Sequence, residues 1–266
     1  MLNPWEVKVQ RAERLFLDFS NIVSEYFILN PAQLEQIQTS DETIEAVLHI
    51  HQQPPMILAS LSGEIIHNLR SALDSLVYEL VLQECSKAGI ELSEVCRRKI
   101  QFPIETVKED LNNVCFLNGL VGTKLFKDLE SFQPFMWGLG EEDETRRRSL
   151  NQGHHLAALQ NLSNRDKHQG INFVFCKLQD FYISLPKDLF IKKDLVYEPT
   201  FASGKRLFTL EFYGTGDPSQ IKIVPRFGLS FGDNKYGFPG DSAVNKLETF
   251  LSQSEYYIHQ LSWHLR

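Results

Sequence analysis

The longest helical pattern in the chain constrains its fold most. It runs from Met56 to Ala88, where apolar residues return at helical spacing, no proline interrupts, and Gly89 follows as a candidate C-cap. A helix of this length must pack against other elements to bury its apolar side. Residues 56–88 are therefore predicted to form the central helix of the protein.

Further elements are predicted on both sides of this helix. An amphipathic pattern from Pro4 to about Phe27 predicts an N-terminal helix, and β-prone segments around Ser40 and Asp41 predict a hairpin. From Gly170 onward, apolar residues run between Gly, Pro and Asp turns, which indicates a mainly antiparallel sheet. The expected segments are a hairpin of 26–39 and 42–52, a short extended piece and a short helix between 89 and 122, helices at 123–132, 150–166 and 241–263, and strands at 171–178, 181–185, 206–213 and 220–231.

The predicted fold class is therefore α+β, with a helical N-terminal half, an N-terminal hairpin, an antiparallel sheet in the C-terminal half and a C-terminal helix. The chain shows no internal repeat and no Gly/Ser linker. We expect residues 1–266 to form a single domain, which is helix-rich over 1–168, strand-rich over 169–240 and closed by a helix over 241–264.

Composition and motifs exclude several classes of protein. The formal net charge of −7 argues against a broad basic surface for non-specific nucleic-acid binding. The four cysteines form no C-x-x-C pair, so neither a disulfide framework nor a structural zinc site is expected. No run suits a signal peptide or a membrane span, which favours a cytoplasmic protein with no membrane partner. Phosphate-loop, dinucleotide and nucleophile-elbow motifs are missing from the sequence, and no cofactor is expected.

A polar stripe marks the central helix. Steps of about 100° per residue place the polar side chains of residues 64–78 on one face of this helix. Arg70 and Asp74 can pair at i, i+4, and Asp74 or Glu64 could orient His67. The stripe is either the solvated side of the helix, a buried structural network, or a functional site. Its members are Glu64, His67, Arg70, Ser71, Asp74 and Tyr78, with Asn68 beside them.

A second polar cluster, Asn164-Arg165-Asp166-Lys167-His168, separates a predicted helix from the first strand of the sheet. A helix end is a common place for site residues. Lys and His also suit the C-terminal end of a helix dipole, so a simple helix cap explains the cluster equally.

Together the two clusters carry a resemblance. The chain resembles a bacterial protein family with an HNLRSALD helix, here His67–Asp74 preceded by Gly63-Glu64, and a later NxDKH(R) segment, here Asn164–His168. Gln169 stands where that family usually has Arg. The resemblance implies that these two segments form the site, and it implies no particular reaction.

A weaker likeness links the chain to HEPN ribonucleases, which are compact helical proteins in which an Arg and a His act on a phosphodiester across a dimer interface. Arg148 and His154 are separated by five residues, as in that pattern. Gly153 directly before His154 disfavours one continuous helix through both residues. The likeness implies a homodimer and a role in bacterial defence or toxin systems.

Three functions stay open at this stage. In the first, the clusters converge to handle RNA or a nucleotide, as a metal-independent ribonuclease or phosphodiesterase. In the second, the protein is a non-catalytic binding or interaction protein and the same side chains form a structural network. In the third, His67, Asp74, Asp166 and His168 hold a metal, although no metal-ligand spacing supports this. For the first function the catalytic residues are His67, His168, Arg70 and Asp74, and the ligand-binding residues are Glu64, Asn68, Asn164, Asp166, Lys167, Arg148 and His154.

Overall fold

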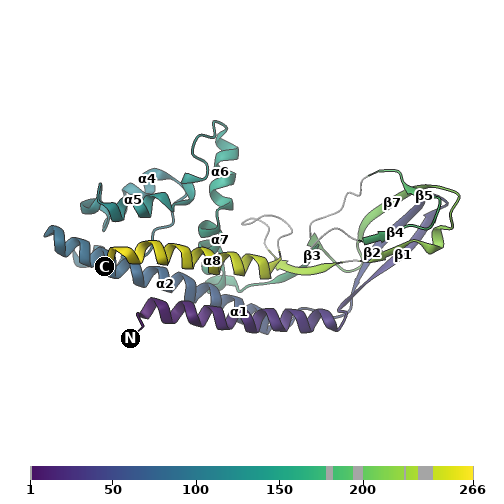
Figure 1. The fold of residues 1–266 in the computed structure, drawn as a ribbon, viewed down its shortest axis with the longest axis horizontal. Coiled ribbons are helices and arrows are strands. Elements are labelled where there is room, and N and C mark those ends of the chain that lie inside the picture. Colours follow the sequence, from purple (N-terminus) through teal and green to yellow (C-terminus); the bar gives the residue numbers. More distant parts are fainter. Residues whose placement is uncertain (1, 178–181, 194–199, 225, 233–241, 266) are drawn as a thin grey trace.

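The protein is described by a computed structural model, which covers residues 2–177, 182–193, 200–224, 226–232 and 242–265. Long helices form one part of the molecule, and a four-stranded sheet lies at the end opposite to the two termini (Figure 1). The fold is α+β, as predicted, and includes the expected N-terminal hairpin, antiparallel sheet and C-terminal helix.

Helix α2 (Ile57–Ala88) is the centre of the helical part. It packs against α1 (Pro4–Ile28), α7 (His155–Gln169) and α8 (Ala243–Ser262). Fourteen of its residues are buried, which leaves only a narrow exposed face. Gly89 ends the helix in the left-handed conformation, with φ 66°, where its missing side chain avoids strain. The predicted central helix and its cap are both confirmed.

Short helices connect α2 to α7. They line one side of the long helices in Figure 1 and pack apolar side chains such as Leu111 and Leu129 into the core, as does Phe102 in the segment between α3 and α4. These elements are α3 (Glu94–Arg97), α4 (Lys108–Asn112), η1 (Asn118–Leu120), α5 (Lys124–Ser131), η2 (Pro134–Met136) and α6 (Glu144–Gly153).

Antiparallel pairing links the N-terminal hairpin to the C-terminal half. The largest sheet has the order β1-β2-β7-β5, so β2 pairs with both β1 and β7. In β2 the residues Ile44, Ala46 and Leu48 are buried and alternate with more exposed ones, as expected for a sheet with one covered face. Its strands are β1 (Ala32–Ser40), β2 (Thr43–Ile50), β5 (Leu189–Ile191) and β7 (Arg206–Gly214).

Two smaller sheets complete the strand-rich part. One has the order β6-β3-β9, and the other pairs β4 with β8. A short helix, η3 (Pro218–Gln220), precedes β8, and η5 (Trp263–Leu265) follows α8. The strands are β3 (Phe173–Lys177), β4 (Tyr182–Ser184), β6 (Thr200–Phe201), β8 (Lys222–Val224) and β9 (Phe227–Phe231).

Several sequence-based elements differ from the structure. The hairpin was placed from residue 26, but α1 continues to Ile28 and β1 begins only at Ala32, after Pro31. The single strand expected over 220–231 is two strands in different sheets, β8 and β9, with residue 225 outside the described residues. The sequence predicts neither β5 nor β6, because three and two residues are too few for an alternating pattern. Asp241, the expected start of the C-terminal helix, also lies outside the described residues.

The helix expected over 150–166 is also two helices. Helix α6 starts at Glu144, before the expected start at residue 150, because Asp143 accepts a capping hydrogen bond from the Arg146 amide at 2.7 Å. Glu144 then pairs with Arg147 and Arg148 one turn on. Helix α6 ends at Gly153. His154 is the N-cap of α7 and has an extended ψ of 137°.

Candidate functional site

The structure brings the two polar clusters of the sequence together. The carboxylate of Asp166, on α7, lies against the backbone of Gly63, on α2: a Cβ at position 63 would be 2.6 Å from Oδ2. The charge of Lys167 also acts on Asp74, further along the same face of α2. His67 and Arg70 lie between Gly63 and Asp74 at helical spacing. The end of α7 therefore lies near the polar stripe of α2. We call this region the α2–α7 face; it consists of Gly63, His67, Asp74, Asp166 and Lys167, and the exposed His168 follows Lys167 on α7.

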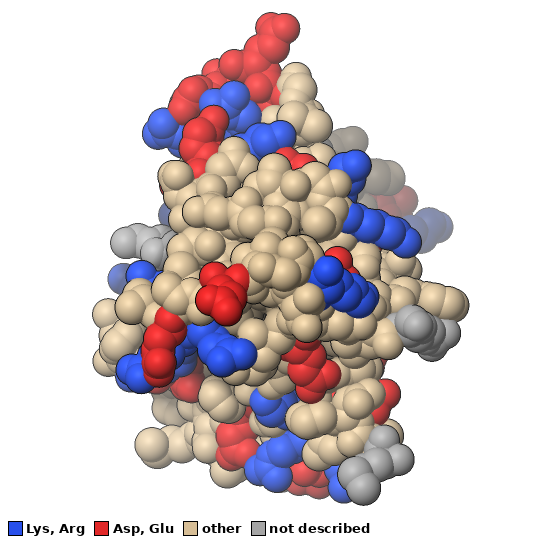
Figure 2. All heavy atoms as spheres, turned by 90° about the vertical axis from the view of Figure 1, so that its left-hand side faces the viewer, with Lys and Arg blue, Asp and Glu red and all other residues tan. Residues whose placement is uncertain are grey.

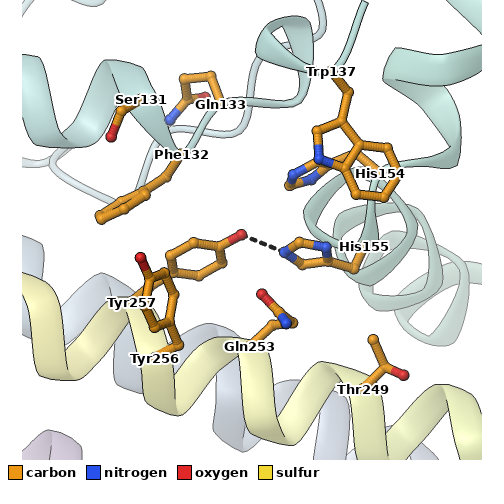
Figure 3. A pocket seen from close by; sticks show the side chains of 10 residues that line it. All are labelled: Ser131, Phe132, Gln133, Trp137, His154, His155, Thr249, Gln253, Tyr256 and Tyr257. Atoms are coloured by element: carbon orange, nitrogen blue, oxygen red, sulfur yellow. Dashed lines mark hydrogen bonds between the residues drawn. The ribbon is translucent and has the colours of Figure 1, made fainter.

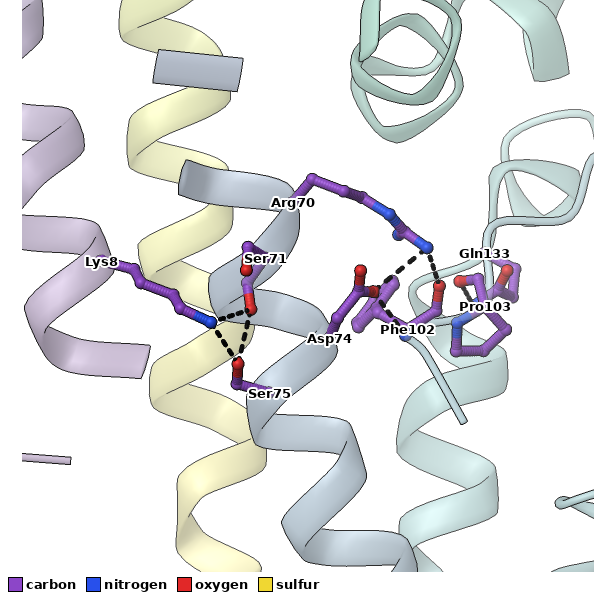
Figure 4. Close-up of polar contacts among 8 residues, drawn as sticks. All are labelled: Lys8, Arg70, Ser71, Asp74, Ser75, Phe102, Pro103 and Gln133. Carbon is purple, nitrogen blue, oxygen red and sulfur yellow. Dashed lines mark hydrogen bonds and ion pairs between the residues drawn. The ribbon is translucent and has the colours of Figure 1, made fainter. Parts of the chain in front are cut away.

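Arg70 and Asp74 form a clamp on the chain segment that follows α3 (Figure 4). Arg70 pairs with Asp74 at 3.2 Å and donates to the carbonyl of Phe102 at 2.7 Å. Asp74 accepts from the Phe102 amide at 2.9 Å. The side chain of Arg70 is only 8% exposed, and its Nη1 is buried without a hydrogen-bond partner among the described residues. The clamp fixes α2 to the connecting segment.

Burial shifts the pKa values of both clamp residues. It lowers the pKa of Arg70, against the opposing carboxylates of Asp74 and Glu105. It raises the pKa of Asp74, and this is opposed first by Arg70, then by the Phe102 amide and by the charges of Lys167 and Lys8. Lys8 approaches from α1, where its ammonium donates to Ser75 Oγ at 2.6 Å and to the Ser71 carbonyl at 3.2 Å.

The remaining predicted residues of the two clusters lie at the surface. His67, Lys167 and His168 are exposed, and among the described residues no hydrogen bond or ion pair joins the two imidazoles. Asn164 is exposed on α7 as well. On α2, Glu64 pairs with Arg11 of α1 at 3.1 Å, and Asn68 donates to the Glu64 carbonyl at 2.7 Å. Thus the clusters meet as an exposed face supported by a buried clamp.

Arg148 and His154 lie in different environments, one at the surface and the other buried. Arg148 is exposed on α6 and pairs with Glu144 at 2.6 Å. His154 is only 3% exposed, and its Nδ1 accepts from the Leu156 amide at 3.1 Å, which caps α7. The helix break that Gly153 suggested is therefore present between them.

A pocket lies between α5, the start of α7 and α8 (Figure 3). It encloses about 510 Å³. Its lining contains two adjacent imidazoles, those of His154 and His155, with ring centroids 4.0 Å apart. His155 Nε2 forms a hydrogen bond with the hydroxyl of Tyr257, from α8. The lining residues are Ser131, Phe132, Gln133, Trp137, His154, His155, Thr249, Gln253, Tyr256 and Tyr257.

The lining of this pocket carries no Lys, Arg, Asp or Glu. Burial lowers the pKa of His154 to about 3, with a smaller contribution from His155. It lowers the pKa of His155 to about 4 and raises that of Tyr257. Both imidazoles and the phenol are therefore uncharged at neutral pH. Of the residues that line this pocket, the sequence analysis selects only His154. Two adjacent histidines are a weak local signal of a site, and Tyr257 gives no such signal.

Charge on the molecule is mixed. Figure 2 shows basic and acidic side chains interspersed over one end, with no broad area of one sign on that face. Within the described part of the chain, no group of three His, Cys, Asp or Glu side chains is placed to hold a metal ion. Nor is any helix there both long enough and apolar enough to cross a membrane.

Comparisons with family models, with curated proteins and with solved structures each find no match to this chain. The resemblance carried by the two motifs therefore stays a prediction.

Proposed function

We propose that this protein binds a phosphate-containing ligand, RNA or a nucleotide, on the α2–α7 face. The observation that carries the proposal is the contact between Asp166 and Gly63, because it joins two segments that are distant in sequence. Lys167 supplies a cation there, and lysine holds phosphate oxygens as a point charge. The imidazoles of His67 and His168 are both exposed, and in this proposal they contact the same ligand.

The proposal gives the predicted residues different roles. His67, Lys167 and His168 are exposed and would contact the ligand. Arg70 and Asp74 are engaged with Phe102 and would position α2 instead. Asp166 would set the distance between the helices through its contact with Gly63.

Binding is better supported than catalysis. In a metal-independent ribonuclease, His67 and His168 would act as general acid and base, each contributing roughly 10²- to 10⁴-fold. The likeness to HEPN ribonucleases rests on Arg148 and His154, and these two lie in different surroundings. The stronger form of the proposal adds catalysis to binding. It includes a ribonuclease reaction, a homodimer and a role in bacterial defence.

The second candidate is a non-catalytic interaction protein whose polar residues are structural. The clamp of Arg70 and Asp74 on Phe102 favours it, because every member is buried or half-buried and bonded to protein. In this function the α2–α7 face binds no phosphate, and substitutions there change stability alone.

The test compares wild type with three single variants, His67→Ala, Lys167→Ala and His168→Ala. Binding to labelled single-stranded RNA and to a nucleoside triphosphate is measured by fluorescence anisotropy at two salt concentrations, with cleavage and thermal melting followed in parallel. His51→Ala and Lys124→Ala, which remove an exposed imidazole and an exposed ammonium elsewhere, are the matched controls.

We expect the three variants to weaken binding several-fold while their melting temperatures and the binding of both controls stay close to wild type. For Lys167→Ala, the slope of log binding constant against log salt concentration should become smaller by about one. Cleavage lost in both histidine variants would support the ribonuclease form. Wild type that binds neither ligand, or face variants that bind as wild type does, would contradict the proposal and favour the second candidate.

A further inference from the structure

We propose that the pocket between α5, α7 and α8 is a separate binding site for an uncharged planar nitrogen heterocycle of nucleobase size. The site shares no residue with the α2–α7 face, so it does not depend on the function proposed there. The size of the cavity, its lack of charge, its fixed polar atoms and its aromatic walls each limit the ligand.

Size sets the first limit. A cavity of about 510 Å³ lies within the range of roughly 300–1,000 Å³ that is typical of small-molecule sites. It can hold a one- or two-ring ligand. A folded peptide or a helix needs a longer groove.

Charge sets the second limit. No side chain in the lining is charged at neutral pH, because the only titratable ones are two imidazoles and two phenols, and both imidazoles resist protonation. A phosphate or carboxylate placed there would lose its hydration without gaining a counter-charge. The ligand group inside the pocket is therefore neutral, in contrast to the phosphate proposed for the other face.

Hydrogen bonding sets the third limit. A neutral imidazole has one donor and one acceptor nitrogen. Nδ1 of His154 accepts from the Leu156 amide, so Nε2 carries the proton and is a donor. His155 uses Nε2 toward Tyr257, which leaves Nδ1 for a ligand. The carboxamide of Gln253, on the facing helix, adds both a donor and an acceptor (Figure 3). Ring nitrogens and carbonyl or amino groups in one plane would match this arrangement.

Aromatic side chains set the last limit. Trp137 is 48% exposed and stands next to His154, with ring centroids 4.6 Å apart. Across the pocket, Phe132 and Tyr257 have centroids 4.7 Å apart, and Tyr256 is half exposed beside them. Planar heterocycles stack on such rings, whereas an aliphatic ligand cannot stack on them.

The test measures binding of adenosine, guanosine, cytidine and uridine to the full chain by calorimetry and by tryptophan fluorescence. Ribose 5-phosphate is the probe that has phosphate and no base. The pocket variants are Trp137→Ala and Tyr256→Ala, which remove exposed rings and leave the buried His154 cap in place. Tyr182→Ala, which removes an exposed ring from β4, is the matched control, and Lys167→Ala tests the other face.

At least one nucleoside should bind, with affinity reduced about tenfold or more in both pocket variants and unchanged in Tyr182→Ala and Lys167→Ala. Ribose 5-phosphate should not compete. A short single-stranded RNA that competes more strongly than the nucleoside would identify the ligand as a base within a strand, whereas equal competition would identify a free nucleoside. The proposal is overturned if no nucleoside binds at millimolar concentration, or if binding survives both pocket variants.

Discussion

The carboxylate of Asp166 lies so close to Gly63 that a methyl group at position 63 would be 2.6 Å from one oxygen and 2.7 Å from the other. Real side-chain carbons do not approach other atoms to this distance. The glycine therefore leaves room for the Asp166 carboxylate against α2, even though glycine within a helix costs roughly 1 kcal/mol relative to alanine.

Gly63→Ala should consequently lower the free energy of unfolding, by about 1–2 kcal/mol, because the gain in helix propensity is smaller than the cost of moving the Asp166 side chain. In an Asp166→Ala background the obstacle is removed, and the same substitution should raise the free energy of unfolding by up to about 1 kcal/mol. Urea unfolding of the four proteins in this cycle gives both values. Equal stabilisation in the two backgrounds would show that the two residues are not in contact.

The clamp on Phe102 predicts an asymmetry between single and double substitutions. Asp74→Ala should lower the free energy of unfolding by about 3 kcal/mol, because it leaves the Arg70 cation buried and the Phe102 amide without its acceptor. The double variant Arg70→Met with Asp74→Leu should cost less than the single one, since no buried charge remains.

The control for the clamp is an exposed pair with the same i, i+4 spacing. Arg98 and Glu94 are 77% and 76% exposed, and Glu94→Ala should change stability by less than about 0.5 kcal/mol. Thermal and urea unfolding measure all three variants. An Asp74→Ala protein as stable as Glu94→Ala would mean that the clamp contributes nothing to the fold.

The sequence predicted the long helices well because their patterns are local. In α2, apolar residues recur over many turns and Gly89 marks the end, so neither signal depends on distant contacts. Gly153 indicates a break before His154, but the cap that the imidazole provides to the Leu156 amide has no sequence pattern of its own, so the start of the following helix is not predicted. The first turn of α6 was missed because a run of charges favours a loop until Asp143 and Glu144 satisfy the amide and guanidinium groups that follow them.

The sequence identifies the residues of the two clusters and leaves open whether they converge, and only the fold shows where they meet. Nothing local relates Gly63 to Asp166, because their proximity follows from the packing of α7 on α2. The pocket was harder still. His155 and Tyr257 are 102 positions apart, and a buried tyrosine on an amphipathic helix has no pattern that separates a pocket wall from ordinary core.

The pocket histidines predict an acid-sensitive fold. In the unfolded chain both titrate near pH 6.5, whereas in the folded protein the pKa is about 3 for His154 and about 4 for His155. As the pH decreases below 6.5, the unfolded state binds protons that the folded state does not, so the free energy of unfolding decreases. The loss should be on the order of 2 kcal/mol in total at pH 5, after allowing for solvent in the pocket, and should grow toward pH 4.

His154→Asn separates this effect from other acid-labile groups. Asparagine keeps a side-chain acceptor for the Leu156 amide and does not titrate in this range. Trp137 and Tyr257, which contact the two imidazoles, carry no charge at acid or neutral pH. Urea unfolding between pH 4.5 and 7.5 should therefore show a shallower decrease for the variant. An identical slope for wild type and variant would mean that His154 is not protected from protonation.

The cysteines should differ in reactivity. The thiol of Cys96, in α3, has its pKa lowered first by a hydrogen bond with the Cys115 thiol and then by one with Ser93. The pKa of Cys115 is raised by the same pairing, and that of Cys85 is raised by burial. Because the thiolate is the reactive form, Cys96 should be alkylated before the other two at pH 7.5. Iodoacetamide labelling with peptide mass spectrometry gives the order, and Cys115→Ala should slow Cys96 several-fold while Cys85→Ala leaves it unchanged. Faster labelling of Cys115 than of Cys96 would mean that the hydrogen bond favours the thiolate of the opposite partner.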